Sequence, residues 1–183
     1  MESDNLLQMT SASTATLREL MDTYGNDIWN YAFFLTGSRE EADDISQEVF
    51  IKIYLKAELF RGQSSMKTWL LTITRNLTFS WKRKMKRRKA IFQTSGSLPN
   101  GSSTQNHPSA ETEVMVKQYN DDIWNIIMRL PAPYLETLVL DIKYDMSIAE
   151  MSSLLRVAPG TVKSRLSRAR EKVRAALDKE EEQ

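Results

Sequence analysis

The sequence predicts an all-α protein made of two small helical domains that are joined by a flexible linker. Apolar residues recur at helical spacing in both halves of the 183-residue chain, and strong helix formers dominate. The alternation of β-branched residues that marks strands is missing. Residues 93–110, QTSGSLPNGSSTQNHPSA, contain one leucine as their only large apolar residue. Such a segment cannot anchor a core and is typical of a linker.

The N-terminal half is predicted to contain three helices. Apolar residues at helical spacing predict the first helix over residues 16–35. Ser38 followed by Glu41 has the spacing of a capping box, which predicts that a second helix begins there and runs over residues 39–57. A third helix is predicted over residues 65–89.

The C-terminal half is predicted to contain four helices that are separated by prolines and turn residues. The predicted helices cover residues 112–129, 133–142, 147–155 and 160–178. Pro131 and Pro133 separate the first two, and Ala158-Pro159-Gly160 separates the last two. Ser147 and Glu150 form a second capping-box pattern at the start of the third helix. The last two helices have the spacing of a helix-turn-helix.

The last helix has one apolar face and one polar, basic face. The predicted packing face consists of Val162, Leu166, Ala169, Val173 and Leu177. The centre of the other side consists of Thr161, Ser164, Ser167, Arg168 and Glu171, and the basic residues that flank it are Lys163, Arg165, Arg170 and Lys172. Small residues allow close approach to DNA, and arginines bind guanine edges or phosphates. This side is therefore predicted to bind the major groove; an ordinary exposed amphipathic helix is the alternative.

Charge is segregated along the chain, although the net charge is only +1. Residues 1–58 hold four Lys or Arg against eleven Asp or Glu, whereas residues 59–110 hold ten basic residues and no acid. Residues 111–155 hold three basic against eight acidic residues, and residues 156–174 hold seven against one. Two basic blocks, each after an acidic block, predict two nucleic-acid contacts; solvated charged faces are the alternative.

The composition excludes several kinds of chemistry. The chain has no cysteine, which excludes a disulfide framework, a thiol nucleophile and a thiolate metal site. The one histidine, His107, lies in the predicted linker, so we expect no catalytic histidine pair, no metal site and no cofactor. No stretch approaches about 18 uninterrupted apolar residues, and the N-terminus lacks the pattern of a secretory signal. We therefore expect a cytoplasmic protein with no membrane insertion.

The predicted helix over residues 39–57 has apolar residues on two sides. The side predicted to face the core consists of Ala42, Ile45, Val49, Phe50 and Ile53. The other side places Ile51 and Leu55 beside Asp44, Gln47 and Glu48. An exposed apolar pair framed by acids is typical of a docking surface for a basic partner helix. A helix buried on two sides within a bundle is the alternative.

The next segment combines a polar loop with aromatic and basic residues. Residues 60–65 form a loop without acids, and seven of the eight residues 82–89 are Lys or Arg. Trp69, Phe79 and Trp81 precede this basic run. Basic side chains bind phosphates and aromatic rings stack on unpaired bases, so the segment is predicted to hold melted DNA. For Trp69 and Phe79, burial in the core is the alternative.

Together these strings resemble the extracytoplasmic-function (ECF) sigma factors of bacterial RNA polymerase. The matching strings are Asp43-Asp-Ile-Ser-Gln-Glu-Val-Phe50, Phe60-Arg-Gly-Gln-Ser-Ser65, Lys67-Thr-Trp-Leu70 with Arg75-Asn76, Leu130-Pro131, and Gly160-Thr-Val-Lys-Ser-Arg-Leu-Ser-Arg-Ala-Arg170. The resemblance implies a sigma-2 helical bundle over residues 14–92, a linker over 93–111 and a sigma-4 helix-turn-helix domain over 112–178. Residues 1–13 are then predicted to be a disordered lead, and residues 179–183 an acidic tail.

The resemblance also implies partners and site residues. The second helix would dock on the coiled coil of the largest subunit of core RNA polymerase through Asp43, Asp44, Gln47, Glu48, Ile51 and Leu55. The sigma-2 domain would capture and melt the minus-ten element of promoter DNA through Phe60, Arg61, Gly62, Gln63, Ser64, Ser65, Lys67, Trp69, Arg75, Asn76, Phe79, Trp81, Lys82 and Arg83. The polar face of the last helix would read the minus-thirty-five element. The polymerase flap and an anti-sigma factor are further implied partners.

Two residues depart from the family pattern. Ser80 stands where the family commonly has aspartate, which bears on minus-ten contacts or helix packing. Arg156 stands where glycine is frequent before the turn, so the turn geometry differs or Arg156 contacts phosphate.

The leading interpretation is a non-catalytic initiation subunit that directs core polymerase to specific promoters and helps to melt the minus-ten region. A stand-alone helix-turn-helix regulator is the first alternative, and it would need neither the basic block nor the exposed Ile51 and Leu55. A nuclease or other hydrolase is the second alternative; Asp43, Asp44 and Glu48 form the only tight acidic group for it.

Overall fold

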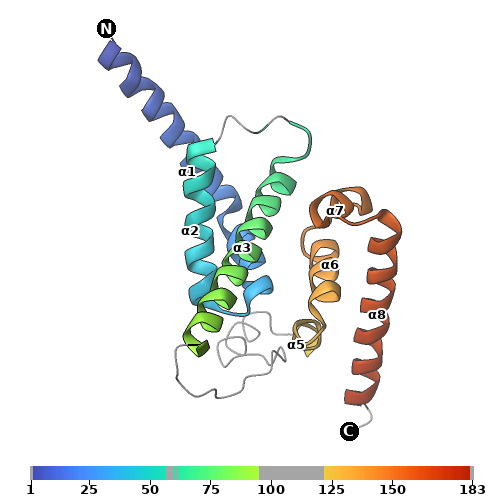
Figure 1. Cartoon of the computed structure of the whole chain (residues 1–183). Helices are drawn as coiled ribbons and strands as arrows, with labels where there is room; N and C mark the ends of the chain where they lie inside the picture. Colours follow the sequence, from blue (N-terminus) through green and yellow to red (C-terminus); the bar gives the residue numbers. More distant parts are fainter. Residues whose placement is uncertain (1, 57–59, 61, 95–121, 182–183) are drawn as a thin grey trace.

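The computed structural model describes residues 2–56, 60, 62–94 and 122–181. These residues form seven helices and no strand, which confirms the predicted all-α class. The helices are α1 (Glu2–Thr36), α2 (Arg39–Lys56), α3 (Met66–Thr94), α5 (Asp122–Met128), α6 (Ala132–Ile142), α7 (Ile148–Leu155) and α8 (Pro159–Glu181). Figure 1 shows two neighbouring groups, α1 to α3 and α5 to α8. The predicted linker lies outside the described residues apart from its first two, which end α3.

Helices α1, α2 and α3 pack around a shared apolar core. The predicted inner face of α2 is buried: Ala42, Ile45, Val49, Phe50 and Ile53 are each at most 9% exposed. These side chains cluster with Ile28, Ala32 and Phe33 of α1 and with Leu70 and Leu77 of α3. Ile51 and Leu55 remain exposed on the opposite side of α2. The alternative in which α2 is buried on two sides is therefore wrong for this structure.

The junction between α1 and α2 follows from two residues. Gly37 has a φ of 75°, in the left-handed region that glycine adopts readily at the end of a helix. The backbone N–H of Glu41 donates to Ser38 Oγ at 3.3 Å, which is the N-cap bond that the sequence predicts. At its other end α1 begins at Glu2, so it includes residues predicted as a disordered lead. Residues 2–24 contain neither Gly nor Pro to interrupt the helix.

Helices α7 and α8 form the predicted helix-turn-helix. At the start of α7, Ser147 Oγ accepts the N–H of Glu150, and the Glu150 carboxylate accepts the N–H of Ser147 at 3.0 Å. This completes the predicted capping box. Val162, Leu166 and Ala169 of α8 are buried, as the apolar spacing predicts.

The two groups of helices share a hydrophobic core. Tyr31, Phe34 and Leu71 of the first group cluster with buried side chains of α5 to α8. The Phe34 ring stacks on Trp124 with 5.6 Å between centroids, and the Tyr31 ring meets Tyr144 edge-on at 5.7 Å. Burial of apolar surface stabilises such a contact. The two predicted domains are therefore in direct contact in this structure.

Candidate nucleic-acid and polymerase interfaces

The outer face of α2 exposes large apolar side chains among acids. Ile51 is 58% exposed and Leu55 is 71% exposed. The exposed polar residues on the same helix include Asp43, Asp44, Gln47 and Glu48. This is the composition that the sequence predicts for a docking surface, and the structure leaves it uncovered by the described residues.

Asp43, one of the docking candidates, accepts a hydrogen bond from a neighbouring helix. Trp29 Nε1 donates to Asp43 Oδ1 at 2.6 Å, and the Trp29 ring stacks on Phe33 with 5.6 Å between centroids. Asp43 thereby joins α2 to α1. Glu48 lies 3.6 Å from Lys52 Nζ, an exposed i,i+4 pair of the kind that contributes little to stability.

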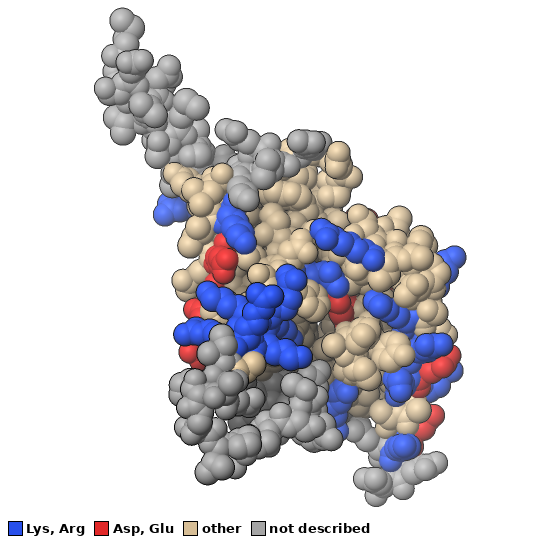
Figure 2. Space-filling model, viewed as in Figure 1, with Lys and Arg blue, Asp and Glu red and all other residues tan. Residues whose placement is uncertain are grey.

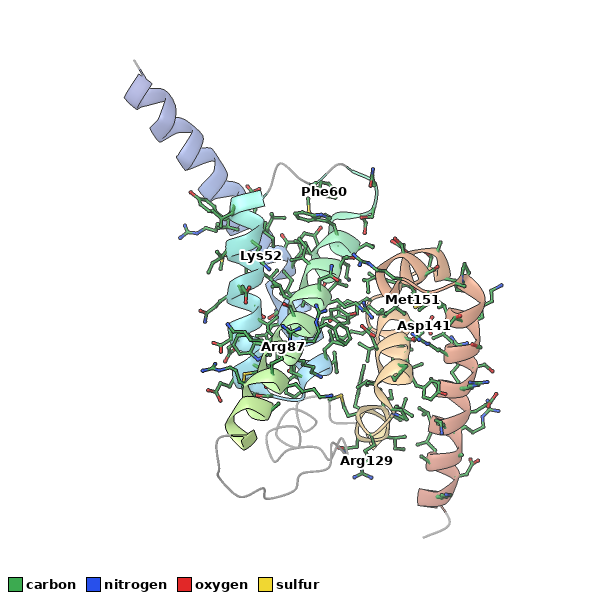
Figure 3. All side chains as sticks on the ribbon, in the orientation of Figure 1. Lys52, Phe60, Arg87, Arg129, Asp141 and Met151 are labelled. Atoms are coloured by element: carbon green, nitrogen blue, oxygen red, sulfur yellow. The ribbon has the colours of Figure 1, made fainter. Side chains whose placement is uncertain are left out.

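The polar loop lies at the start of α3, where Figure 3 shows Phe60. The Phe60 ring is tilted over Trp69 with 5.3 Å between centroids. Ser65 Oγ accepts the N–H of Thr68 at 3.1 Å and so caps α3. The exposed residues between are Gly62, Gln63 and Ser64, whereas Arg61 lies outside the described residues. Gly62 has a φ of 66°, which explains the glycine in this turn.

Two of the aromatic candidates on α3 face inward and one faces outward. Trp69 and Trp81 are partly buried and pack against the core of the first group, so core packing accounts for much of their surface. Phe79 is 39% exposed, and the guanidinium of Arg75 lies 4.6 Å from its ring centroid. For Phe79 the alternative of core burial is wrong.

The basic run of α3 forms a charged surface, and Figure 2 shows Lys and Arg gathered over this helix. A hollow of about 420 Å³ on it is lined by Ser80, Arg83, Lys84, Arg87 and Arg88. Lys82 behaves differently, because its Nζ donates to the carbonyl of Leu35 at the end of α1. Partial burial lowers the pKa of Lys82. A lysine at this position stabilises the negative end of the α1 dipole.

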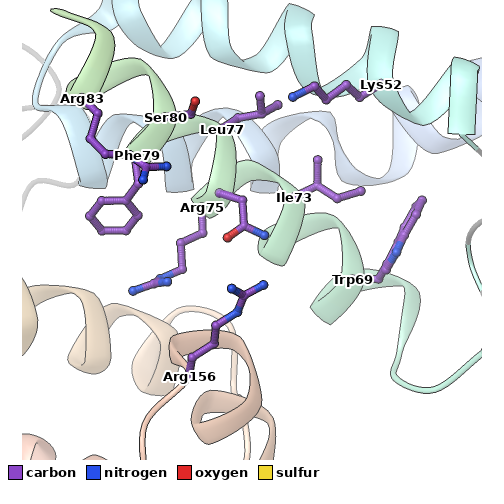
Figure 4. Close-up of a pocket in the computed structure, with 10 residues that line it drawn as sticks. Lys52, Trp69, Ile73, Arg75, Leu77, Phe79, Ser80, Arg83 and Arg156 are labelled. Atoms are coloured by element: carbon purple, nitrogen blue, oxygen red, sulfur yellow. The ribbon is translucent and has the colours of Figure 1, made fainter. Parts of the chain in front are cut away.

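A larger cavity of about 770 Å³ lies along α3 and reaches the second group of helices. Its lining includes Trp69, Arg75, Asn76, Phe79 and Arg83, all of which the sequence predicts as minus-ten residues. The structure therefore brings five of these residues together. Arg156 of the second group also lines the cavity, as Figure 4 shows.

The polar side of α8 is exposed as predicted. Lys163, Ser164, Ser167, Arg168 and Arg170 are exposed, and Thr161 and Arg165 are partly exposed. Lys163, Ser167 and Arg170 line a hollow of about 410 Å³ between α7 and α8. Arg170 Nη2 lies 2.8 Å from Asp141 Oδ2 of α6, which holds this arginine in place.

The contact between the two helical groups includes two predicted minus-ten residues, Arg75 and Lys67. It also includes Glu136, which the sequence did not single out. Arg75 Nε donates to Glu136 Oε1 of α6 at 2.7 Å. Lys67 Nζ lies 3.2 Å from Asp27 Oδ2 and 5.2 Å from the Tyr144 ring. Glu136 is only 6% exposed, although it stands in an otherwise apolar helix segment. An acidic residue at a core position of an apolar helix could have indicated that its carboxylate has a buried hydrogen-bond or ion-pair partner.

Two acid–base groups at this contact have shifted pKa values. Burial raises the pKa of Tyr31 well above its ordinary value of 10.0, and the neighbouring Glu136 carboxylate raises it further. The hydroxyl and the N–H of Ser147 lower the pKa of Glu150, and a hydrogen bond from Thr68 of α3 acts in the same direction.

The described residues contain no group of three or more His, Cys, Asp or Glu side chains that could hold a metal ion. In the same ranges, no helix combines the length and apolar character needed to cross a membrane.

The fold and these surfaces define a class: a two-domain helical DNA-binding protein with a helix-turn-helix and a separate basic surface. Residues 20–88 match Sigma-70 region 2, and residues 120–173 match Sigma-70, region 4. The chain is 31% identical over 147 residues to the ECF RNA polymerase sigma factor EcfG of Rhodopseudomonas palustris, covering 80% of this chain and 77% of that protein. It is 28% identical over 174 residues to the ECF RNA polymerase sigma factor SigW of Bacillus subtilis, covering 93% of each.

Solved structures agree with these matches. The sigma factor RpoE of Bartonella quintana, in complex with the anti-sigma factor NepR, has a TM-score of 0.65 and 27% identity, covering 88% of this chain and 95% of that one. The chain therefore belongs to the ECF family of RNA polymerase sigma factors, and its function is that of an alternative sigma factor. Sigma factors are transcription initiation factors and not catalysts. The alternative of a stand-alone regulator has no comparable support.

Proposed function

We propose that the three surfaces described above have separate roles in transcription initiation: one binds polymerase and two bind promoter DNA. The outer face of α2, from Asp43 to Leu55, docks on the coiled coil of the largest polymerase subunit. The loop at residues 60–65 and the exposed face of α3 hold the melted minus-ten element. The polar face of α8 reads the minus-thirty-five element as duplex, and the chain itself catalyses no reaction.

The observation that carries this proposal is the exposed pair Ile51 and Leu55 on the helix next to the basic, aromatic surface of α3. A docking face and a DNA surface on one three-helix unit place promoter DNA beside polymerase. Burial of the apolar pair against a partner helix would supply hydrophobic stabilisation, and the surrounding acids would select a basic partner. The work would take place in the cytoplasm, where core polymerase acts.

An anti-sigma factor is the partner that we propose for the inactive state. The structure of RpoE in complex with NepR, and the match to that sigma factor, support this partner. The polymerase flap is the further contact that we propose for the second group of helices.

Permanganate footprinting of a promoter tests the melting role. Core polymerase with the full chain should make thymines of the minus-ten region reactive, and Asn76→Ala should reduce that reactivity. Lys179→Ala, at an exposed position near the end of α8, is the control and should leave it unchanged. A minus-ten region that stays unreactive while transcripts form would contradict the assignment.

A further inference from the structure

Arg156 adopts a backbone conformation that is unfavourable for an arginine. It ends α7 with φ 57° and ψ 48°, in the left-handed region, and its N–H donates to the carbonyl of Ser152. Glycine is the usual residue at such a helix end, because a side chain is strained there. Strained residues are concentrated at functional sites, which directs attention to what the Arg156 side chain contacts.

The Arg156 side chain leaves its own helical group and enters the cavity along α3. Figure 4 shows the side chains of Arg156 and Arg75 both extending into the space between α3 and the second group, and both line this cavity of about 770 Å³. Lys52 of α2 and Arg83 of α3 also line it, and the lining residues include no Asp or Glu. Four cationic side chains from three helical elements therefore line one cavity.

The charges in the cavity are only partly balanced by neighbouring acids. Arg75 uses its Nε–H on Glu136 at 2.7 Å, which leaves four of its five N–H donors on the two Nη atoms. Lys52 lies 3.6 Å from Glu48. Neither Arg83 nor Arg156 forms an ion pair within the described part of the chain. Like charges that line one cavity repel one another, and an anion bound among them would offset that repulsion.

The chemistry of the lining indicates the kind of anion. Guanidinium groups bind phosphate through two parallel N–H···O bonds, which suits a tetrahedral oxyanion between two arginines. The ring of Phe79 is 39% exposed beside Arg75, and Trp69 also lines the cavity. Aromatic surface next to such a phosphate position suits a nucleobase. The volume lies within the range of about 300–1,000 Å³ that is usual for small-molecule sites.

We propose that Arg156, Arg75 and Arg83 form a site for the phosphate group of a nucleotide, between α7 and α3. A phosphate bound by residues of both helical groups would stabilise the contact between them. The nucleotide is either free or part of single-stranded DNA, since both present the same phosphate chemistry. If the phosphate belongs to single-stranded DNA, the inference rests on the proposed minus-ten function. If it belongs to a free nucleotide, the inference does not depend on that function.

Binding of three probes to the full chain tests the site: inorganic pyrophosphate, ATP without divalent metal, and a short single-stranded DNA oligonucleotide. The test variant is Arg156→Gly, because glycine suits the left-handed backbone and should leave the thermal midpoint unchanged or higher. Arg129→Ala is the matched control; it removes the same charge from an exposed position that lies away from the cavity in Figure 3.

We expect Arg156→Gly to weaken binding by about tenfold or more while Arg129→Ala leaves it unchanged. Such a loss for any of the three probes supports the phosphate site. Tighter wild-type binding of ATP than of the oligonucleotide would identify a free nucleotide as the source, and the reverse order of affinities would identify DNA. Equal affinity of wild type and Arg156→Gly, an equal loss in both variants, or no binding of any probe would overturn the inference. Promoter-dependent transcription, measured separately, tests the proposed function. A chain that binds phosphate but does not support transcription would contradict the proposed function alone. A chain that supports transcription but does not bind phosphate would contradict this inference alone.

Discussion

The hydroxyl of Tyr31 on α1 donates a buried hydrogen bond of 3.0 Å to the carboxylate of Glu136 on α6. The same oxygen of Glu136 accepts the Nε–H of Arg75 at 2.7 Å. Tyr31 is fully buried and Glu136 is 6% exposed, so water cannot replace either partner easily. One carboxylate of the second helical group thus binds two residues of the first, and one of these is a proposed minus-ten residue.

Glu136→Ala should destabilise the protein by about 3–5 kcal/mol, because it leaves the Tyr31 hydroxyl and the Arg75 guanidinium without their buried acceptor. Urea denaturation of the full chain measures this loss. Glu48→Ala is the control, since it breaks an exposed ion pair and should cost about 0–1 kcal/mol. Similar losses in both variants would show that the buried contact between the two groups is not a main source of stability.

Ser147→Ala should destabilise the protein by about 1 kcal/mol at neutral pH, because it removes the N-cap of α7. Ser147 also lowers the pKa of Glu150 below its ordinary value of 4.5. A carboxylate with a lowered pKa stabilises the fold above its unfolded-state pKa, and that stabilisation is lost as the pH falls through the folded-state pKa. The difference between wild type and variant should therefore shrink at acid pH. Because Glu150 is partly exposed, the pH-dependent part should stay below about 1 kcal/mol.

Thermal or urea unfolding of both proteins as a function of pH measures whether this stability difference shrinks at acid pH. A difference between wild type and Ser147→Ala that is constant, or that grows below the ordinary value of 4.5, would contradict a lowered pKa of Glu150 in the folded state.

Leu55→Asp should weaken binding to core polymerase by about tenfold or more without loss of stability, because Leu55 is 71% exposed and contributes little to the core. Fluorescence anisotropy of the labelled chain with core polymerase measures the affinity. Met21→Asp is the matched control on α1, where an apolar side chain is 46% exposed outside the proposed face. If both variants bind as wild type does, the docking surface lies elsewhere.

Arg168→Ala should reduce affinity for promoter duplex by about 1–3 kcal/mol if this exposed side chain contacts a base. The measurement compares a promoter duplex with a random duplex of equal length, using polymerase assembled with the full chain. A loss on the promoter duplex alone supports base reading. An equal loss on both would show that Arg168 contacts phosphate.

The sequence predicts the local features well because they depend on neighbouring residues. The capping box of Ser147 and Glu150 and the two faces of α2 both follow from spacings within one helix, and the structure confirms them. The contact between Tyr31 and Glu136 joins residues that are 105 positions apart. Helical periodicity says which face of a helix is buried but not which distant element covers it.

The sequence could not predict the cavity along α3, because the cavity depends on which distant helix packs beside α3. Arg75, Asn76 and Phe79 lie within about one helical turn, so their proximity is local. Arg156 joins them only because α7 packs beside α3. The departure of Arg156 from the glycine of the family was visible in the sequence, but the direction of its side chain was not.

Run-off transcription with purified bacterial core polymerase, with and without this chain, tests the central claim most directly. On a pool of promoters from the host genome, the account predicts discrete new transcripts that appear only when the chain is present. Their start sites would give both promoter elements at once. No new transcripts, together with duplex binding by the chain alone, would contradict an initiation role and favour a stand-alone regulator.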